Sequence, residues 1–222
     1  MKAVSGFIMC RNEAPFIKHA VSSLLPCCDD IFIIDMGSTD GTLDALADIS
    51  SANPIIRIEQ HKQRSQVAHE SFTKSSWLNY AAERCLHDWV VRIDGDEYLQ
   101  CAADLLRLSP VPLRFPSLNI TADGDMIVEE RLESGNYSYY PAANVRFYNR
   151  NEAGWSLGIR HNMIVSLADG KIIDGYRTDA LTWHYHALYK PRKHVVNKPG
   201  HFFKLPLSLT PPVPLDQINE RH

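Results

Sequence analysis

The sequence predicts an α/β fold in which helices flank a mostly parallel sheet and the C-terminal half adds a small mixed β extension. Two observations lead to this prediction. In the first half of the chain, short apolar runs of strand length alternate with segments whose apolar residues recur at helical spacing. In the second half, short strand patterns follow one another with turns between them.

The first half is predicted to contain four strands and the helices that connect them. The strands are apolar runs, as expected for strands buried on both faces of a sheet. They cover residues 4–9, 31–34, 55–58 and 89–93. The helices have apolar residues at helical spacing and cover residues 12–24, 43–49 and 71–86. Pro26 ends the first helix, because proline cannot continue one.

The second half is predicted to contain five shorter strands and a tail. The strands cover residues 113–120, 126–131, 145–148, 162–167 and 180–185. We expect a single domain made of two halves, residues 1–110 and 111–204. Residues 205–222 carry four prolines and are predicted to form an extended, loosely held tail.

The composition is that of an ordinary soluble globular protein. With 45% apolar and 22% charged residues, disorder, a collagen repeat and a coiled coil are excluded. The formal charge of -3 argues against a nucleic-acid partner. The five cysteines include no CxxC pair, so we expect buried thiols rather than disulfides or a zinc site. No apolar run is long enough for a membrane span or a signal peptide, so we expect a cytoplasmic protein.

Acidic residues stand where two of the predicted strands end. Asp94 and Asp96 flank Gly95 directly after residues 89–93, and Asp35 ends the run at 31–34. Ligands of parallel sheets bind beyond the carboxyl ends of the strands. Two carboxylates there suit Mg²⁺ or Mn²⁺, which could neutralise a leaving phosphate, whereas Asp35 could accept hydrogen bonds from a base or ribose. The alternatives are a solvated acidic turn and a helix-capping turn without a ligand.

Three motifs in the same order resemble glycosyltransferase family 2. They read GFIMCRNE at 6–13, IIDMGSTDGT at 33–42 and DWVVRIDGDE at 88–97, with NYAA at 79–82 before the last. The resemblance covers about residues 3–100. It implies the GT-A fold and transfer of a sugar from a nucleotide diphosphate donor with inversion. Residues 1–110 would then bind the nucleotide-sugar, and residues 111–204 would form the acceptor side.

The resemblance assigns roles to individual residues of the first half. Arg11 would pack against the nucleotide base, where a guanidinium can stack, and Asp35 would bind the base or ribose. Asp94 would face the ribose and the metal, and Asp96 would bind the metal directly. Glu97 follows, as in the branch of the family whose motif reads DxDE, and is predicted with Asp96 as catalytic.

Four further residues are predicted on the donor side, each with a plainer alternative. Asn79 could order the donor pocket from its helix, or serve only in capping or packing. Lys74 on the same helix could reach a phosphate, or be a solvated lysine. Lys190 and Arg192 begin a basic segment, residues 190–204, that could close over the diphosphate. The alternative for that segment is a basic surface loop or a patch that contacts anionic lipid.

The acceptor side departs from the family pattern. Residues 146–162 resemble a segment that ends in a His-Glu pair, but Asn162 stands in place of the glutamate. The general base is therefore unassigned, with His161 as a chemically sensible substitute. Other candidates by position are Asp125, Glu129, Glu130 and Glu152. His184 resembles a histidine that completes the metal site, and His186, which points to the same face of a strand, is the less favoured choice.

The predicted function is that of a metal-dependent inverting glycosyltransferase. The donor would be a nucleotide diphosphate-sugar, most simply a UDP-sugar, although Met36 replaces a second aspartate seen in many relatives. The acceptor would be a hydroxyl of a glycan or glycolipid, the cofactor Mn²⁺ or Mg²⁺, and peripheral membrane contact is left open. The alternatives are a nucleotidyltransferase and a non-catalytic sugar-nucleotide-binding protein. A nucleotidyltransferase would carry a Gly-rich basic phosphate loop after the first strand, and this sequence has no such loop there.

Overall fold

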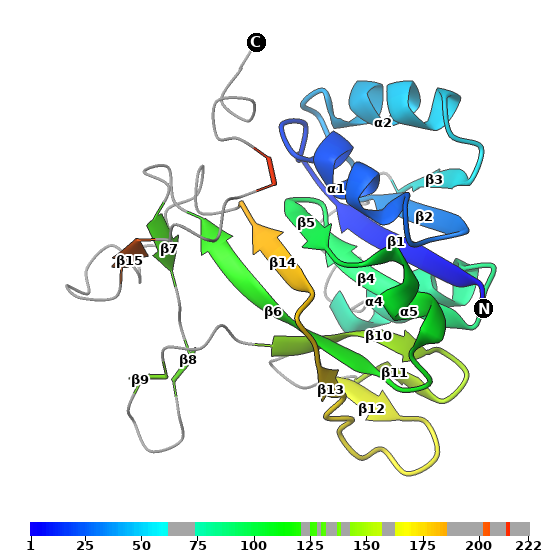
Figure 1. The fold of residues 1–222 in the computed structure, drawn as a ribbon. Helices are drawn as coiled ribbons and strands as arrows, with labels where there is room; N and C mark the ends of the chain where they lie inside the picture. Colours follow the sequence, from blue (N-terminus) through cyan, green and yellow to red (C-terminus); the bar gives the residue numbers. More distant parts are fainter. Residues whose placement is uncertain are drawn as a thin grey trace, which may run out of the picture.

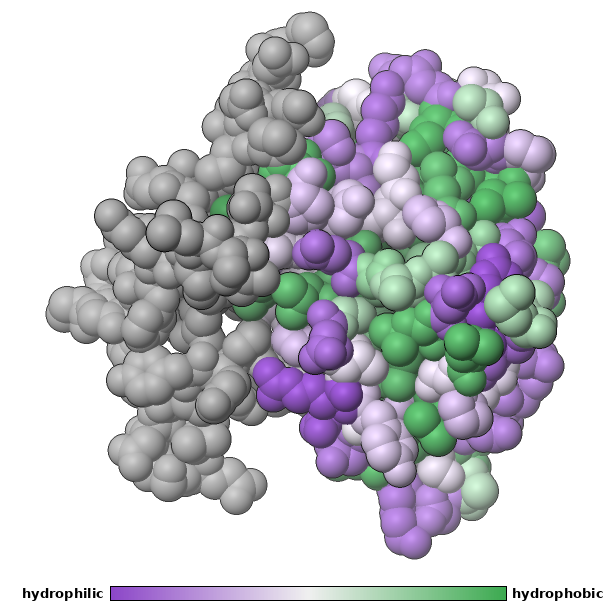
Figure 2. Space-filling model, viewed as in Figure 1, coloured by the Kyte–Doolittle hydropathy of each residue, from purple (hydrophilic) through white to green (hydrophobic). Residues whose placement is uncertain are grey.

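The computed structural model describes most of the predicted domain. The described residues are 1–61, 74–120, 125–127, 130–131, 137–138, 143–156, 163–185, 202–204 and 212–213. None of the helices in these ranges is both long and apolar enough to span a bilayer. On the face shown in Figure 2, hydrophobic residues of the described part lie in small groups between hydrophilic ones.

The parallel part of the sheet is confirmed. It consists of β1 (Val4–Cys10), β2 (Asp30–Asp35), β3 (Ile56–Gln60) and β4 (Trp89–Asp94). The strands pair in the order β4-β1-β2-β3, all parallel, so that their carboxyl ends lie at one edge (Figure 1). β2 is buried at all six positions, as its continuous apolar run predicts.

The mixed β extension is also confirmed. β10 (Ala143–Asn149) joins β4 in the antiparallel sense, and β6 (Leu113–Ile120) joins β10. β14 (Leu181–His184) runs parallel to β6 and antiparallel to β5 (Glu97–Gln100). The smaller strands are β7 (Asp125–Ile127), β8 (Glu130–Arg131), β9 (Tyr137–Ser138), β11 (Ala153–Trp155), β12 (Ile164–Ser166), β13 (Tyr176–Arg177) and β15 (Phe202–Lys204).

Helices cover both faces of the sheet. On one face, α1 (Ile17–Leu24), α2 (Thr42–Ser51) and α5 (Ala103–Leu108) share an apolar cluster with the strands. On the other face, α4 (Lys74–Arg84) packs with the β11–β12 hairpin in a second cluster. A third cluster joins β6 and β14 to Val213, so this residue of the predicted tail is buried. Residues 205–211 and 214–222 lie outside the described residues.

The first helix begins later than predicted. The pattern from residue 12 indicates a helix, but Asn12 has a φ of 57° and therefore lies in the left-handed region. Its backbone N–H donates to Ser38 Oγ and its carboxamide accepts from the backbone of Thr39. Residues 11–16 thus form a turn tied to the β2–α2 loop, and the helix starts at Ile17.

Asp30 is expected to be one of the strongest electrostatic contributors to stability. It is 1% exposed and accepts hydrogen bonds from Ser5 Oγ, the Leu86 backbone and two nitrogens of Arg57, at 2.8–3.0 Å. Burial alone would raise its pKa, but these partners hold the pKa below its usual value. Asp30→Asn should therefore lower the free energy of unfolding at pH 7 by about 3 kcal/mol, as urea denaturation can measure.

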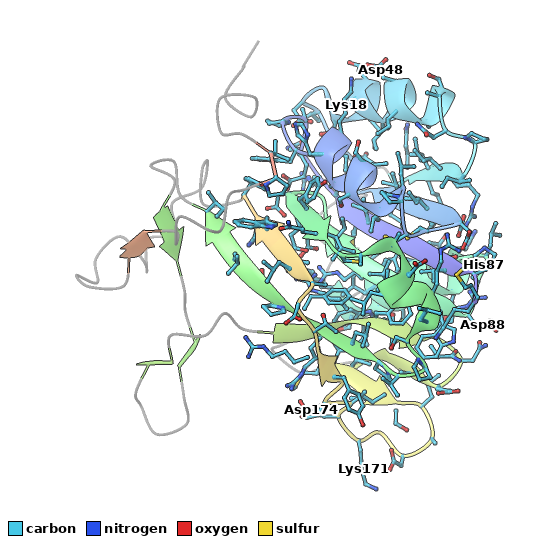
Figure 3. The ribbon with its side chains drawn as sticks, viewed as in Figure 1. Lys18, Asp48, His87, Asp88, Lys171 and Asp174 are labelled. Carbon is cyan, nitrogen blue, oxygen red and sulfur yellow. The ribbon has the colours of Figure 1, made fainter. Side chains whose placement is uncertain are left out.

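The pH dependence of this effect has a definite sign. Because the pKa of Asp30 is lower in the folded chain, its stabilisation is complete above the unfolded pKa of about 3.9 and is lost as pH falls through the folded pKa. The difference in the free energy of unfolding between wild type and Asp30→Asn should become smaller in that acidic range. Asp48→Asn is the control, because the Lys18–Asp48 pair is exposed (Figure 3). Equal stability of wild type and Asp30→Asn at pH 7 would contradict the prediction.

Candidate active site

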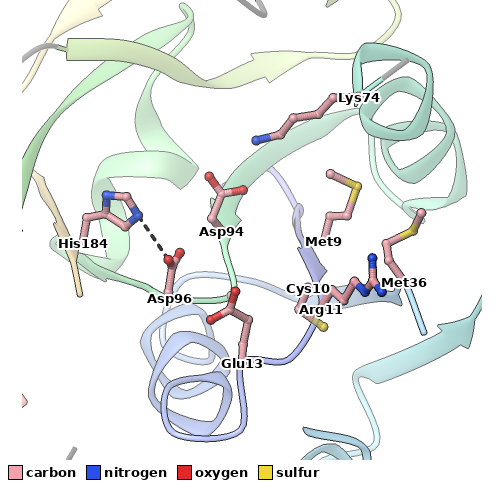
Figure 4. A pocket seen from close by; sticks show the side chains of 10 residues that line it. Met9, Cys10, Arg11, Glu13, Met36, Lys74, Asp94, Asp96 and His184 are labelled. Atoms are coloured by element: carbon pink, nitrogen blue, oxygen red, sulfur yellow. Dashed lines mark hydrogen bonds and ion pairs between the residues drawn. The ribbon is translucent and has the colours of Figure 1, made fainter. Parts of the chain in front are cut away.

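A cavity of about 310 Å³ lies at the carboxyl ends of β1 and β4 (Figure 4). This is the edge at which the sequence predicts a ligand site. The cavity is lined by Met9, Cys10, Arg11, Glu13, Met36, Lys74, Asp94, Gly95, Asp96 and His184. It therefore brings together five of the residues predicted for donor or metal binding, which are Arg11, Lys74, Asp94, Asp96 and His184.

Strand pairing explains why the acidic motif meets the end of β1. β1 and β4 are adjacent parallel strands with Met9 opposite Asp94, so the turn after Asp94 lies against the residues after β1. A Cβ at Gly95 would stand 2.8 Å from the Cβ of Cys10 and 3.1 Å from the Cγ of Glu13. Only glycine allows this close approach without a shift of the turn.

β14 brings His184 to the same place from the far end of the described chain. It pairs with β5 so that His184 lies opposite Glu97, and the Tyr185 backbone N–H donates to the Asp96 carbonyl at 2.9 Å. His184 Nε2 lies 3.2 Å from Asp96 Oδ2. Burial alone would lower the pKa of His184, but its hydrogen bond to Asp96 and the surrounding carboxylates outweigh burial and raise it.

Asp94 is held as a carboxylate by cations on three sides. Arg92, two residues earlier on β4, donates to its Oδ1, and Arg146 lies 3.8 Å from its Oδ2. Figure 4 shows Lys74 extending from α4 toward it. Burial would raise the pKa of Asp94, but Arg92, Lys74 and Arg146 together lower it. Asp94 is thus negatively charged at neutral pH.

The chemistry of the donor set fits a hard divalent cation. Asp96 and His184 place an oxygen and a nitrogen within 3.2 Å of each other, and the Asp94 carboxylate faces the same cavity. Among the described residues, no three His, Cys, Asp or Glu side chains gather as a metal-binding group. One or two side chains completed by phosphate oxygens and water are typical for Mg²⁺. The site therefore fits a metal that arrives with a diphosphate.

Three residues predicted for the site do not line the cavity. Asp35 is 1% exposed, and its carboxylate accepts from the Ser38 hydroxyl and from the backbones of Gly37 and Ser38 at 3.0 Å. This geometry is that of the turn-capping alternative. Asn79 donates to the Trp155 carbonyl at 2.9 Å and accepts from the Trp155 N–H at 2.7 Å. Its carboxamide is used in packing α4 against β11.

The third is Glu97, predicted as catalytic. It is 3% exposed, its Oε1 accepts from Arg146 at 2.7 Å, and its Oε2 accepts from the Asp94 backbone N–H at 2.8 Å. Both carboxylate oxygens are therefore engaged beneath the cavity. This arrangement favours a role in holding the turn over a role in proton transfer.

Several predicted residues fall outside the described part of the chain. These are Glu129, His161, His186, Lys190 and Arg192. Of Asp125 in β7 and Glu130 in β8, only the backbone is described. Glu152 is exposed in the turn before β11 and does not line the cavity.

The sequence reasoning missed Glu13, Met9 and Cys10 as cavity residues, and Arg92 and Arg146 as partners of Asp94. Two of these carry a signal in the sequence. Glu13 follows the first strand within three residues, and Arg92 alternates with Asp94, so that the two point to one face of the strand.

The first part of the chain matches a known protein family. Residues 5–105 match the family model described as Glycosyl transferase family 2. This segment, slightly less than half of the chain, is similar to glycosyltransferase family 2. The matched segment contains every cavity residue except His184. The assignment to the DxDE branch stays a prediction.

The curated relatives of this chain are longer than it is. A lipopolysaccharide core biosynthesis glycosyltransferase, LpsC, of Rhizobium meliloti is 33% identical over 99 residues, 45% of this chain and 33% of the relative. An uncharacterized glycosyltransferase of Rickettsia felis is 30% identical over 45% of this chain and 30% of its own length. An uncharacterized glycosyltransferase of Rickettsia typhi is 26% identical over 83% of this chain and 61% of its own length. The chain thus spans about a third of the first two relatives.

Solved structures show a more distant likeness. Staphylococcus aureus TarS 1-349 aligns with a TM-score of 0.45 and 15% identity over 72% of this chain and 52% of that one. The mannosyltransferase PcManGT of Pyrobaculum calidifontis, solved with GDP-Man and Mn²⁺, aligns with a TM-score of 0.40 and 20% identity over 59% and 36%.

Proposed function

We propose that the chain is a metal-dependent inverting glycosyltransferase that uses a nucleotide diphosphate-sugar. The observation that supports this most is the composition of the cavity. It combines Asp94 and Asp96 of the family-2 segment with His184, and it is bordered by the cations Arg11 and Lys74. A metal site next to two cations suits a diphosphate, whose charge both can neutralise.

Five of the cavity residues have a task in this proposal. Asp96 and His184 would hold Mn²⁺ or Mg²⁺, which when bound stabilises the negative charge of the departing diphosphate. Lys74 would pair with a phosphate as a point charge. Arg11, exposed at the end of β1, would stack its guanidinium on the nucleotide base. Asp94 would accept hydrogen bonds from the ribose.

The donor and the acceptor are proposed more specifically than the site alone requires. We take the donor to be a UDP-sugar and the acceptor to be a hydroxyl of a glycan or glycolipid. The likeness to LpsC, which acts in lipopolysaccharide core biosynthesis, supports the acceptor class. The acceptor hydroxyl needs a base, which stays unassigned, and His161 is one of its candidates.

A thermal-shift screen tests this function. The purified chain is heated with UDP-glucose, UDP-N-acetylglucosamine, UDP-galactose or GDP-mannose, in Mn²⁺ or in EDTA. A donor at 100 times its Kd adds about 2.7 kcal/mol of stability, which should raise Tm by about 5–10 °C in Mn²⁺ only. The absence of a Mn²⁺-dependent shift with every donor would contradict the proposal.

A further inference from the structure

Arg146 occupies an irregular position in β10. Val145 pairs with Arg114 of β6, and Phe147 pairs with the next residue of that strand, Leu113. Arg146 is therefore the extra residue of a β-bulge. Bulges bend a strand and re-aim a side chain, and they are frequent beside active sites. Arg146 is 4% exposed, and its guanidinium contacts Asp94 and Glu97 of the acidic motif.

The contacts of Arg146 reach both sides of Asp96. Its Nη2 donates to Glu97 Oε1 at 2.7 Å, and its Nη1 lies 3.8 Å from Asp94 Oδ2. Glu97 in turn accepts the backbone N–H of Asp94 through its Oε2 at 2.8 Å. Arg146 and Glu97 thus close a loop of interactions around the turn from Asp94 to Glu97.

Arg146 compensates part of the negative charge of the acidic motif. Three carboxylates, Asp94, Asp96 and Glu97, lie within four residues and are largely buried. Such carboxylates repel one another strongly unless they are paired. Arg146 forms an ion pair with the Glu97 side chain, as Arg92 does with Asp94. Burial would lower the pKa of Arg146, but Glu97 and Asp94 raise it, so the guanidinium stays charged.

We propose that Arg146 is a positioning residue that holds the turn from Asp94 to Glu97 in the shape that binds the metal and the donor. It acts through Glu97 and Asp94 and does not itself line the cavity. It lies outside the family-2 segment, so the second half of the chain supplies a buried support for the motif of the first. The inference rests on the proposed function.

The test compares Arg146→Lys, Arg146→Met and the double variant Arg146→Met with Glu97→Gln. Removal of Arg146 alone leaves Glu97 buried and unpaired and can prevent folding, whereas the double variant removes both charges. The glutamine introduced by Glu97→Gln keeps an oxygen for the Asp94 N–H. The control is Arg107→Met, which breaks the Arg107–Asp29 pair near the start of β1. UDP affinity is measured by calorimetry across a Mn²⁺ titration and in EDTA.

The expected result is a loss of metal coupling without a loss of fold. The double variant should keep a Tm within about 3 °C of wild type, with UDP affinity in EDTA unchanged. Its Mn²⁺ midpoint, the Mn²⁺ concentration that gives half of the full gain in UDP affinity, should rise by about 10–100-fold. This is the effect expected for residues that orient metal ligands. Arg146→Lys should restore part of this loss, because it returns the charge without the fork geometry. Arg107→Met should match wild type.

Two different results would overturn two different proposals. If wild type binds UDP in a Mn²⁺-dependent way and the double variant has the same Mn²⁺ midpoint as wild type, Arg146 has only a structural role. If wild type shows no Mn²⁺-dependent binding of any nucleotide, the proposed function itself fails, and the role of Arg146 fails with it.

Discussion

Replacing Asp96 with asparagine is expected to lower kcat/KM for sugar transfer by about 10³-fold, or about 4 kcal/mol of transition-state stabilisation. Asparagine keeps the size of the side chain but removes the negative charge beside His184. Its NH₂ group also cannot bind a cation. The Mn²⁺-dependent thermal shift by the donor should disappear in the same variant.

The fold of this variant can be checked separately. Asp96 is 5% exposed and its backbone carbonyl is bonded to Tyr185, an interaction that asparagine retains. Loss of the His184 contact is offset because the repulsion of Asp96 by Asp94 and Glu97 also disappears. Tm without ligand should therefore change little, and Asp48→Asn serves as the exposed control. An Asp96→Asn protein that keeps both Mn²⁺-dependent donor binding and turnover would show that the metal is held elsewhere.

Replacing His184 with glutamine should weaken Mn²⁺ binding by about 10–100-fold and remove its dependence on pH near neutrality. A metal binds the neutral imidazole, so Mn²⁺ and the proton compete for His184. Because its pKa is raised above the usual 6.5, the competing proton is present at higher pH than for an ordinary histidine. Mn²⁺ affinity of wild type should therefore rise as pH increases through this raised pKa.

Calorimetric Mn²⁺ titrations with UDP between about pH 6 and pH 8.5 measure this dependence. His87→Gln is the control, because His87 precedes β4 at the other end of that strand (Figure 3). If wild type and His184→Gln change their Mn²⁺ affinity with pH in parallel, His184 is not a metal ligand.

The part of the fold and site that could be predicted depends on local patterns. The four parallel strands are continuous apolar runs, and Asp94 and Asp96 follow one of them directly, so sequence order alone places them at the edge of the sheet. β5 and α5 were not predicted. Both are short, four and six residues long, and β5 begins inside the acidic motif.

The hydrogen-bond and ion-pair partners of the predicted site residues could not be predicted in the same way. Asp35 and Glu97 are the kinds of residue that bind ligands, but the structure surrounds them with donors from the chain itself. The direction of the Arg146 side chain depends on a register shift between β10 and β6. The residue pattern of either strand alone does not predict this shift. Residue identity and spacing in the sequence indicate where a carboxylate lies. Its role depends on whether hydrogen-bond donors of the chain itself already occupy its oxygens.

The double hydrogen bond between Asn79 and Trp155 also fixes how α4 is rotated about its own axis. A helix turns by about 100° per residue, so a slip of one residue against β11 would swing every side chain of α4 by that angle. Lys74 lies five residues before Asn79 and extends into the cavity only in the present orientation. The β11–β12 hairpin thus sets the angular position of Lys74, more than one helical turn away from Asn79 along α4.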